Sequence, residues 1–307
     1  MQKGYRLAEG KLVEVTEGLA PIVTFTDPTE EERKYCVQEL KIDEHTLASA
    51  LDPDELSRVE FEPEHIAVIY SAPSTYMGRD RFTFKGGTAG AFLFKDKLVI
   101  VGLSSVPAFY AVQFTRIQTN AGLVLKLILG AVAHFREHLK SISMIADELQ
   151  KEINTAMENR QLIHLFTLEK SLVYYLNFIH GNGVLLERLK HNAVKVGFSP
   201  EEIEILEDIM IENSQCIKQA EIYSNIIASL MDARASIVGN NLNVLIKTLN
   251  IITIALMGPT LVVSIFSMNV KLPGRPMESG AMFWMVLALA TVSALVTFLI
   301  WWPHRRR

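Results

Sequence analysis

A stripe of neutral polar side chains follows an apolar segment near the C-terminus. Hydroxyl and amide oxygens in one stripe can bind a neighbouring helix, or they can line a water-filled path when several copies surround an axis. Helix association needs only one or two such residues, whereas this stripe runs the whole length of the segment, so we favour the path. On a helical wheel the stripe occupies a sector about 100° wide, with Leu249 and Ser267 at its edge, and it contains Asn243, Asn250, Thr253, Met257, Thr260 and Ser264.

Histidines and carboxylates elsewhere offer other chemistry. The segment HFREH (134–138) matches the H-x-x-E-H pattern of zinc hydrolases, and His134 and His138 would share one helix face and could bind a metal. An amphipathic helix has the same spacing and no third ligand is identifiable, so we predict that the protein is not an enzyme. The acidic run at 201–208, which includes Asp208, could hold a hard cation between subunits, because carboxylate oxygens are natural ligands of Mg²⁺.

Other features of the sequence argue against nucleotide-binding, nucleic-acid-binding and secreted proteins. The glycine-rich segment FKGGTAG (84–90) lacks the spacing of a phosphate-binding loop or a dinucleotide fingerprint, so it predicts a hairpin turn, and we expect no cofactor. A net charge of −4 without a basic patch gives no reason to expect a nucleic-acid partner. Cys36 and Cys216 form no C-x-x-C motif and are expected to be reduced thiols. The polar N-terminal segment predicts no signal peptide.

Two uncharged apolar segments, 248–266 and 281–302, are long enough to be membrane spans, because about 20 helical residues cross a ~30 Å hydrocarbon core. We place the transmembrane hairpin at 244–307, with spans at about 244–266 and 281–302. Trp284 and Trp301 lie near the ends of the second span, as interfacial aromatics do, and a run of three arginines ends the chain. By the positive-inside rule, both termini are expected on the cytoplasmic side of the cytoplasmic membrane.

The rest of the chain must position these spans. Residues 1–199 are predicted to form one domain, in which strand-like runs such as APIVTFT, HIAVIYSAP and AFLFKDKLVIVGL alternate with short helices. From Asn120 the pattern is helical, with breaks predicted at 181–183 and 197–200. Ser199 and Glu202 form a capping box that begins a new helix. That helix would form a stalk at 200–243 and continue to residue 266, a length of about 100 Å.

These features together resemble the CorA family of divalent-cation channels. The resemblance rests on two C-terminal spans, a short outer loop, a basic tail and Ser267-Met268-Asn269, which takes the place of the family's Gly-Met-Asn signature. Segments 27–32, 49–73 and 92–103 resemble the family's cytoplasmic domain. The implied fold is an α+β membrane protein with a cytoplasmic α/β/α domain, a long stalk helix, two C-terminal transmembrane helices and the shape of a homopentameric funnel.

The resemblance also implies roles for individual residues. Asn269 would form a polar ring at the outer mouth together with Met268 and Ser267, and Thr260 a second ring deeper in the pore. Met257 and Leu249 would form the apolar constriction that gates by dewetting. The remaining positions would be Thr253 and Ser264 in the pore lining, Asn243 at its inner end, and Asp208 with Asp80 at a regulatory cation site.

The expected function is transport of a divalent cation through a homopentamer in lipid. Mg²⁺ influx is the first candidate, because Mg²⁺ keeps several waters and the stripe contains no carboxylate that would hold the ion too tightly for flux. Two alternatives stay open. One is a transporter of Zn²⁺, Co²⁺ or Ni²⁺ with the same architecture, and the other is a non-conducting, membrane-anchored cation sensor.

Overall fold

The protein divides into two compact units, Met1–Met231 and Asp232–Arg307. The computed structural model describes the following residues of the 307-residue chain: 2–8, 11–15, 20–74, 82–102, 119–153, 159–268 and 280–301.

The first unit contains a seven-stranded sheet with the strand order β2-β1-β3-β7-β6-β5-β4. The pairing of β3 with β7 is parallel, and the other pairings are antiparallel. Two of the runs predicted as strands, APIVTFT and HIAVIYSAP, each contain one strand of this sheet, and the third, AFLFKDKLVIVGL, contains the end of one strand and the whole of the next. The strands are β1 (Gln2–Ala8), β2 (Lys11–Val15), β3 (Ile22–Thr26), β4 (Arg58–Phe61), β5 (His65–Pro73), β6 (Gly86–Phe94) and β7 (Leu98–Gly102).

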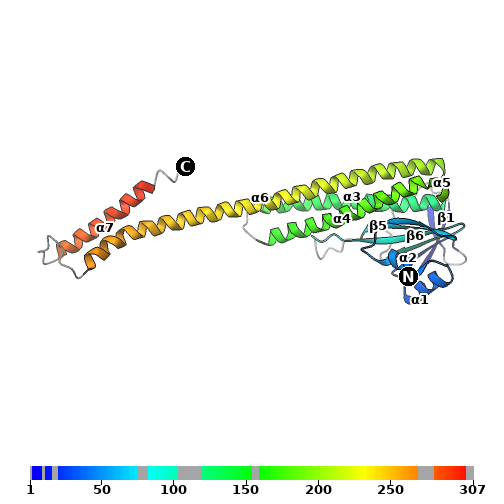
Figure 1. The fold of residues 1–307 in the computed structure, drawn as a ribbon, viewed down its shortest axis with the longest axis horizontal. Helices are drawn as coiled ribbons and strands as arrows, with labels where there is room; N and C mark the ends of the chain where they lie inside the picture. The colour runs from blue at the N-terminus through cyan, green and yellow to red at the C-terminus, as the bar shows by residue number, and fades with distance from the viewer. Residues whose placement is uncertain are drawn as a thin grey trace. The chain divides into compact units, whose positions relative to one another are not determined.

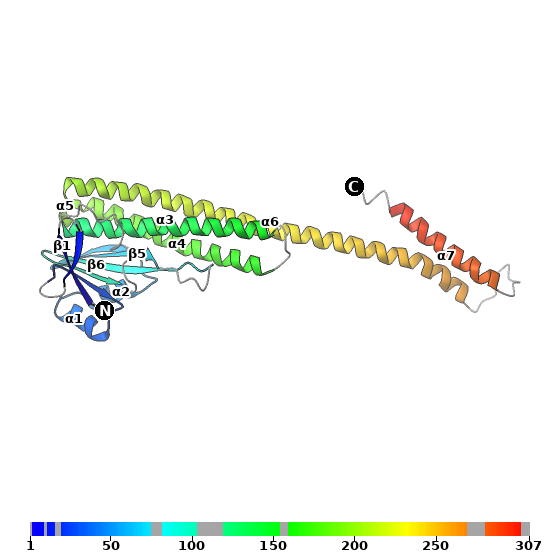
Figure 2. The same ribbon diagram turned by 180° about the vertical axis from the view of Figure 1, so that it is seen from behind.

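Helices cover both faces of the sheet, as the expected α/β/α arrangement requires (Figure 1). Helices α1 (Glu30–Gln38) and α2 (Glu44–Leu51) cover one face, while α3 (Asn120–Ile153) and α4 (Asn159–His191) cover the other. The view from behind shows α3 and α4 side by side over the sheet (Figure 2). Because both faces are buried, the central strands read as nearly continuous apolar runs.

The predicted capping box is confirmed at the start of α6 (Pro200–Ser267), which follows the short helix α5 (Ala193–Val196). The Glu202 backbone N–H donates to Ser199 Oγ at 3.2 Å, and the Ser199 N–H donates to Glu202 Oε2 at 2.8 Å. The other carboxylate oxygen of Glu202 accepts a hydrogen bond from the Thr119 hydroxyl, just before α3. One carboxylate therefore joins the beginnings of α3 and α6.

Helix α6 is one continuous helix from Pro200 to Ser267, with Pro259 inside it. This confirms the predicted uninterrupted helix through residue 266. The second predicted span corresponds to α7 (Gly280–Trp301). The predicted domain limits at residues 199 and 243 stay predictions.

The predicted break at 181–183 is wrong, because α4 continues through Gly181, Asn182 and Gly183. Asn182 is fully buried, and its side-chain amide bonds to the main chain of β5 as a neighbouring strand would. Its Nδ2 donates to the Ser71 carbonyl at 2.8 Å, and its Oδ1 accepts from the Ser71 N–H at 2.9 Å and from the Ser57 hydroxyl at 2.9 Å. The glycines allow this close approach, since a Cβ at Gly181 would lie 3.3 Å from Ser57 Oγ.

The turn predicted for the glycine-rich segment at 84–90 is also wrong. Gly86 and Gly90 lie in β6, and Gly86 pairs with Pro73 of β5. A Cβ at Gly86 would lie 2.6 Å from the ring of Phe178, and a Cβ at Gly90 would lie 2.6 Å from Cβ of Ala50. Close packing on both faces of the strand, and not turn geometry, explains these glycines.

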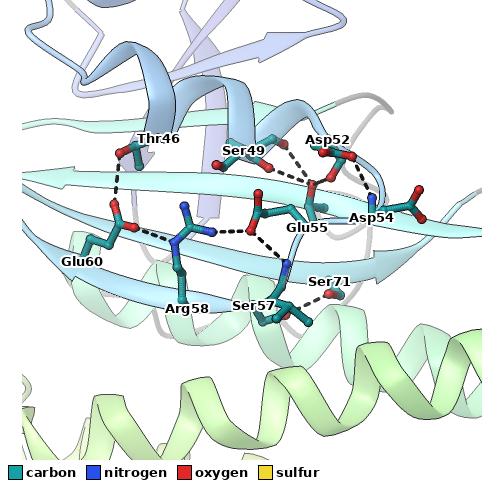
Figure 3. A network of polar contacts seen from close by, with 12 residues as sticks. Thr46, Ser49, Asp52, Asp54, Glu55, Ser57, Arg58, Glu60 and Ser71 are labelled. Carbon is teal, nitrogen blue, oxygen red and sulfur yellow. Dashed lines mark hydrogen bonds and ion pairs between the residues drawn. The ribbon is translucent and has the colours of Figure 1, made fainter.

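A polar network closes the edge of the sheet at β4 (Figure 3). Arg58 donates from Nε to Glu60 at 2.5 Å and from a terminal nitrogen to Glu55 at 2.7 Å, and Glu60 also accepts from the Thr46 hydroxyl of α2 at 3.0 Å. Burial opposes ionisation of Glu60, but the hydrogen bonds from Arg58 and Thr46 outweigh it and lower the pKa of this carboxyl. Charged side chains on an edge strand also discourage pairing with another sheet.

Candidate functional site

The C-terminal part of α6 is the candidate site, and it is apolar without being buried. Among the described residues, α6 is the helix long and apolar enough to cross a bilayer, and none of its apolar window is buried within the chain. The described apolar run of α7, Phe283–Val296, is shorter. Leu249 is 63% exposed and Met257 64%. An apolar surface of this extent needs lipid or other protein copies to cover it.

Three hydroxyl groups in the stripe or at its edge, those of Thr253, Thr260 and Ser267, are bonded to their own helix. Thr253 Oγ1 donates to the Leu249 carbonyl at 2.9 Å, and Thr260 Oγ1 donates to the Leu256 carbonyl at 2.6 Å. Ser267 Oγ donates to the Ser264 carbonyl at 2.9 Å. A carbonyl can only accept, so each hydroxyl proton is used inside the helix, and the oxygen lone pairs remain to accept from outside.

This geometry gives the stripe a defined chemistry, that of neutral hydrogen-bond acceptors. Thr253, Thr260, Ser264 and Ser267 are all exposed, and the segment 243–268 contains no carboxylate. Such oxygens can accept hydrogen bonds from the water shell of a cation without replacing that shell. Mg²⁺ dehydrates reluctantly and usually keeps several waters when bound. The arrangement therefore suits a hydrated divalent cation.

The other predicted site residues have different surroundings. Asn243 is exposed on α6, and Met268, just after the helix, is 56% exposed. Asp208 is exposed on the early part of α6, next to Glu207, which pairs with Lys190 at 2.8 Å. Asn269 and Asp80 lie outside the described residues, so neither the outer mouth nor the predicted regulatory pair is tested by the geometry.

The histidine pair at 134–138 forms part of the packed core. His138 is buried, its Nδ1 lies 2.6 Å from the Tyr175 hydroxyl, and the ring of His134 lies 4.4 Å from its own ring. Burial and then the neighbouring His134 lower the pKa of His138 to about 4. In the described part of the chain, no group of three or more His, Cys, Asp or Glu residues could hold a metal ion. The contacts of this pair are those of structural histidines.

Comparison with known proteins identifies the family. Residues 22–305 match the family described as CorA-like Mg²⁺ transporter protein. The chain belongs to this family. It is 24% identical over 280 residues to the cobalt/magnesium transport protein CorA of Methanocaldococcus jannaschii, with 88% of this chain and 86% of that protein covered. The family consists of membrane transporters, which confirms the resemblance and the transport function expected at this level.

Solved structures show the same fold. The complete CorA magnesium transporter of M. jannaschii superposes with a TM-score of 0.80 at 21% identity, covering 98% of this chain and 96% of that one. The full-length CmaX protein gives a TM-score of 0.73 at 16% identity over 99% and 96% of the two chains. The ZntB cytoplasmic domain of Vibrio parahaemolyticus gives 0.62 at 12% identity over 78% of this chain and 98% of the domain. The expected fold of the chain, an α/β/α domain followed by a long helix and a second C-terminal helix, is thereby confirmed.

Proposed function

We propose that several copies of this protein form a channel for divalent cations, lined by the polar stripe of α6 and carrying Mg²⁺ into the cell. The observation that carries the proposal is the direction of the hydroxyl hydrogen bonds. Because Thr253, Thr260 and Ser267 donate to their own helix, they offer acceptors to a hydrated ion. The relative from M. jannaschii is named as a cobalt/magnesium transport protein, which supports Mg²⁺ or Co²⁺ as the ion.

The proposal requires an oligomer, and we propose a homopentamer. Two spans in one chain cannot enclose a water-filled path, whereas one stripe per chain repeated around an axis can. The protein would lie in the cytoplasmic membrane with both termini inside, in agreement with the basic residues 305–307. The transported ion is the substrate, and no resident cofactor is required.

Each site residue has a place along this path. Asn269, with Met268 and Ser267, would form the outer mouth. Met257 and Leu249 would form an apolar constriction that closes by losing water. The hydroxyls of Ser264, Thr260 and Thr253 would line the path, with Asn243 at its inner end, and Asp208 with Asp80 would contribute to a regulatory site.

Matched threonine variants test the proposal. Thr248 makes the same bond to its helix as Thr253, with its Oγ1 2.8 Å from the Val244 carbonyl, but it lies off the stripe. Thr253→Val and Thr260→Val should lower ion flux, because they remove acceptors from the stripe. Thr248→Val removes a hydroxyl with the same kind of hydrogen bond from outside the stripe, so it should leave the flux unchanged. Flux of Mg²⁺, Co²⁺ and Zn²⁺ into liposomes would be measured side by side, with the particle mass determined in detergent. Equal flux in all three variants, or a monomeric particle, would refute the pore.

A further inference from the structure

Helix α4 carries an apolar stripe that is exposed in the part of the chain that the structure describes. On a helical wheel the stripe lies within a sector about 100° wide, roughly opposite the face that packs on the sheet. Its members are unusually exposed for side chains of their kind, at 48–63%. They are Ile163, Phe166, Val173, Tyr174 and Val184. Lys170 and Asn177 lie in the same sector and interrupt the stripe. Exposed apolar side chains gathered on one side of a folded unit mark an interaction site.

Helix α6 carries a second exposed stripe within the same unit. Ile211 is 57% exposed, Ile222 55% and Ile226 44%. They share one side of the helix, away from Leu206, Ile209 and the other α6 residues that enter the core. The first unit therefore presents two apolar stripes on two different helices.

The two stripes match in their positions along the helices. Within one chain α4 and α6 are antiparallel, because the Lys190 ammonium lies 2.8 Å from Glu207 while Asn213 Nδ2 donates to the Ile179 carbonyl at 3.0 Å. Counting the same number of residues in opposite directions along the two helices, from each of these contacts, shows which residues of α6 lie at the same height as a residue of α4. Val184 lies at the height, or level, of residues 208–213. Ile211 lies within that interval.

The same count aligns the other apolar residues. Val173 falls at the level of residues 219–224, which include Ile222, and Phe166 falls at the level of 226–231, which begins with Ile226. Copies related by rotation about an axis along these helices keep the same levels. Each of the three isoleucines of the α6 stripe would thus meet an apolar residue of the α4 stripe on the next copy.

Charges along the stripes are compatible with this contact. Arg188, exposed at one end of the α4 stripe, falls between the levels of Glu204 and Asp208, which are exposed on α6. Lys218 of α6 falls at the level of the uncharged Asn177. Arg188 thus meets carboxylates, and neither Lys218 nor the exposed Lys170 of the α4 stripe meets a like charge, so this register brings no charge repulsion into the interface.

We propose that the exposed apolar stripe of α4 docks onto the exposed apolar stripe of α6 in the neighbouring copy of this chain. The contact is heterologous, since two different surfaces meet, and such a contact closes into a ring when the rotation closes. The inference rests on the proposed oligomeric channel. It adds the surfaces by which the soluble units of adjacent copies recognise each other.

Disulfide trapping in the full-length protein tests the contact. Val184→Cys and Ile211→Cys, placed on separately tagged copies that are co-expressed in membranes, should yield a disulfide between chains. The mismatched pair of Val184→Cys with Ile222→Cys is the control, because its partners differ by about three helical turns in level. The native thiols do not interfere: burial raises the pKa of Cys36 to about 11 and that of Cys216 to about 12.

A charge exchange keeps the test independent of cysteine chemistry. Val173→Glu and Ile222→Arg should each reduce the assembled fraction several-fold at fixed protein concentration, and the double variant should recover it. Failure of both the matched disulfide and the charge rescue in an assembled, ion-conducting protein would overturn the docking and leave the channel standing. A conducting monomer would overturn both. Equal trapping in matched and mismatched pairs would also overturn the docking.

Discussion

Asn182 and the hydroxyls of the α6 stripe complete their hydrogen bonds in different ways. Asn182 is fully buried and has partners on both its oxygen and its nitrogen, all supplied by Ser57 and Ser71 of the same chain. Thr253 and Thr260 use their protons within the helix and keep exposed oxygens. A polar group that the chain satisfies completely serves the fold, whereas one with acceptors left open is available to something outside the chain.

This contrast leads to separable expectations. Changes in the stripe should alter ion movement and leave the folding of the first unit intact, because the stripe lies in the second unit. Changes at Asn182 should lower the stability of the first unit and leave the order of preference among ions unchanged. A variant that moved both properties together would break the distinction.

The largest effect is expected at the outer mouth. Asn269→Ala should abolish selective Mg²⁺ uptake, since each unmatched water donor would cost about 1–3 kcal/mol, a factor of about 5 to 150 in binding. Ser267→Gly should preserve or raise uptake, because glycine relieves any backbone restriction there. Uptake and its inhibition by cobalt hexaammine, a mimic of the hydrated ion, would be measured on assembled protein. Full transport by Asn269→Ala would contradict the proposed filter.

The constriction comes next in expected size. Met257→Asp and Leu249→Asp should each produce a leaking channel with several-fold higher resting flux, because a charged ring keeps the constriction wet. Met257→Leu is the matched control, since it retains an apolar side chain of similar volume, and its resting flux should stay low. If both aspartate variants kept the wild-type flux, these residues would face lipid or neighbouring helices instead.

Asn182 tests the other side of the comparison. Asn182→Ala removes three buried hydrogen bonds and leaves the main chain of Ser71 without partners on that side, so it should destabilise the first unit by about 3–5 kcal/mol. Asn177→Ala, at an exposed position of the same helix, should cost less than about 0.5 kcal/mol. Native-state hydrogen exchange of β5 and α4 measures both. A changed Mg²⁺ to Co²⁺ flux ratio in folded Asn182→Ala would show that the network also acts on the pore.

The smallest effect concerns pH and the buried His138. Its folded pKa of about 4 lies below the ordinary value of 6.5, so the unfolded chain binds more protons between these two values. The contribution of neutral His138 to the free energy of unfolding is fully present above about pH 6.5. It decreases as the pH falls towards 4, by at most roughly 3 kcal/mol. Hydrogen exchange of α3 and α4 at pH 7 and pH 5 should show the loss. His138→Gln should flatten the slope, and an unchanged slope would assign it to other groups.

The sequence predicts most of the fold, because its long elements have strong local signals. The start of α3 at Asn120, the Ser199–Glu202 capping box and the three strand runs all follow from local patterns, and the structure confirms them. The errors lie where tertiary contacts decide. Glycines at 86 and 181 indicate turns and breaks by propensity, yet Phe178 and Ser57 occupy the space that a side chain would need.

The candidate site shows a similar limit. The wheel selects Thr253 and Thr260 from their spacing, and the structure adds the direction of their hydrogen bonds, which a wheel cannot supply. The local signal for this bond is a threonine in the interior of a helix, because its hydroxyl can donate to the carbonyl four residues earlier. The importance of Asn182 has no such signal, because its partners lie more than a hundred residues earlier in the chain.

The parallel pairing of β3 with β7 sets an order for events during synthesis. Ile22 pairs with Leu98, so the strands at the amino-terminal edge cannot join the rest of the sheet until β7 has left the ribosome. Until then, the apolar side chains of Val23 and Phe25 lack the neighbours that later bury them on that face. Contacts this distant in sequence form slowly. A nascent chain that stalls before residue 98 would therefore expose an unfinished sheet to chaperones and proteases.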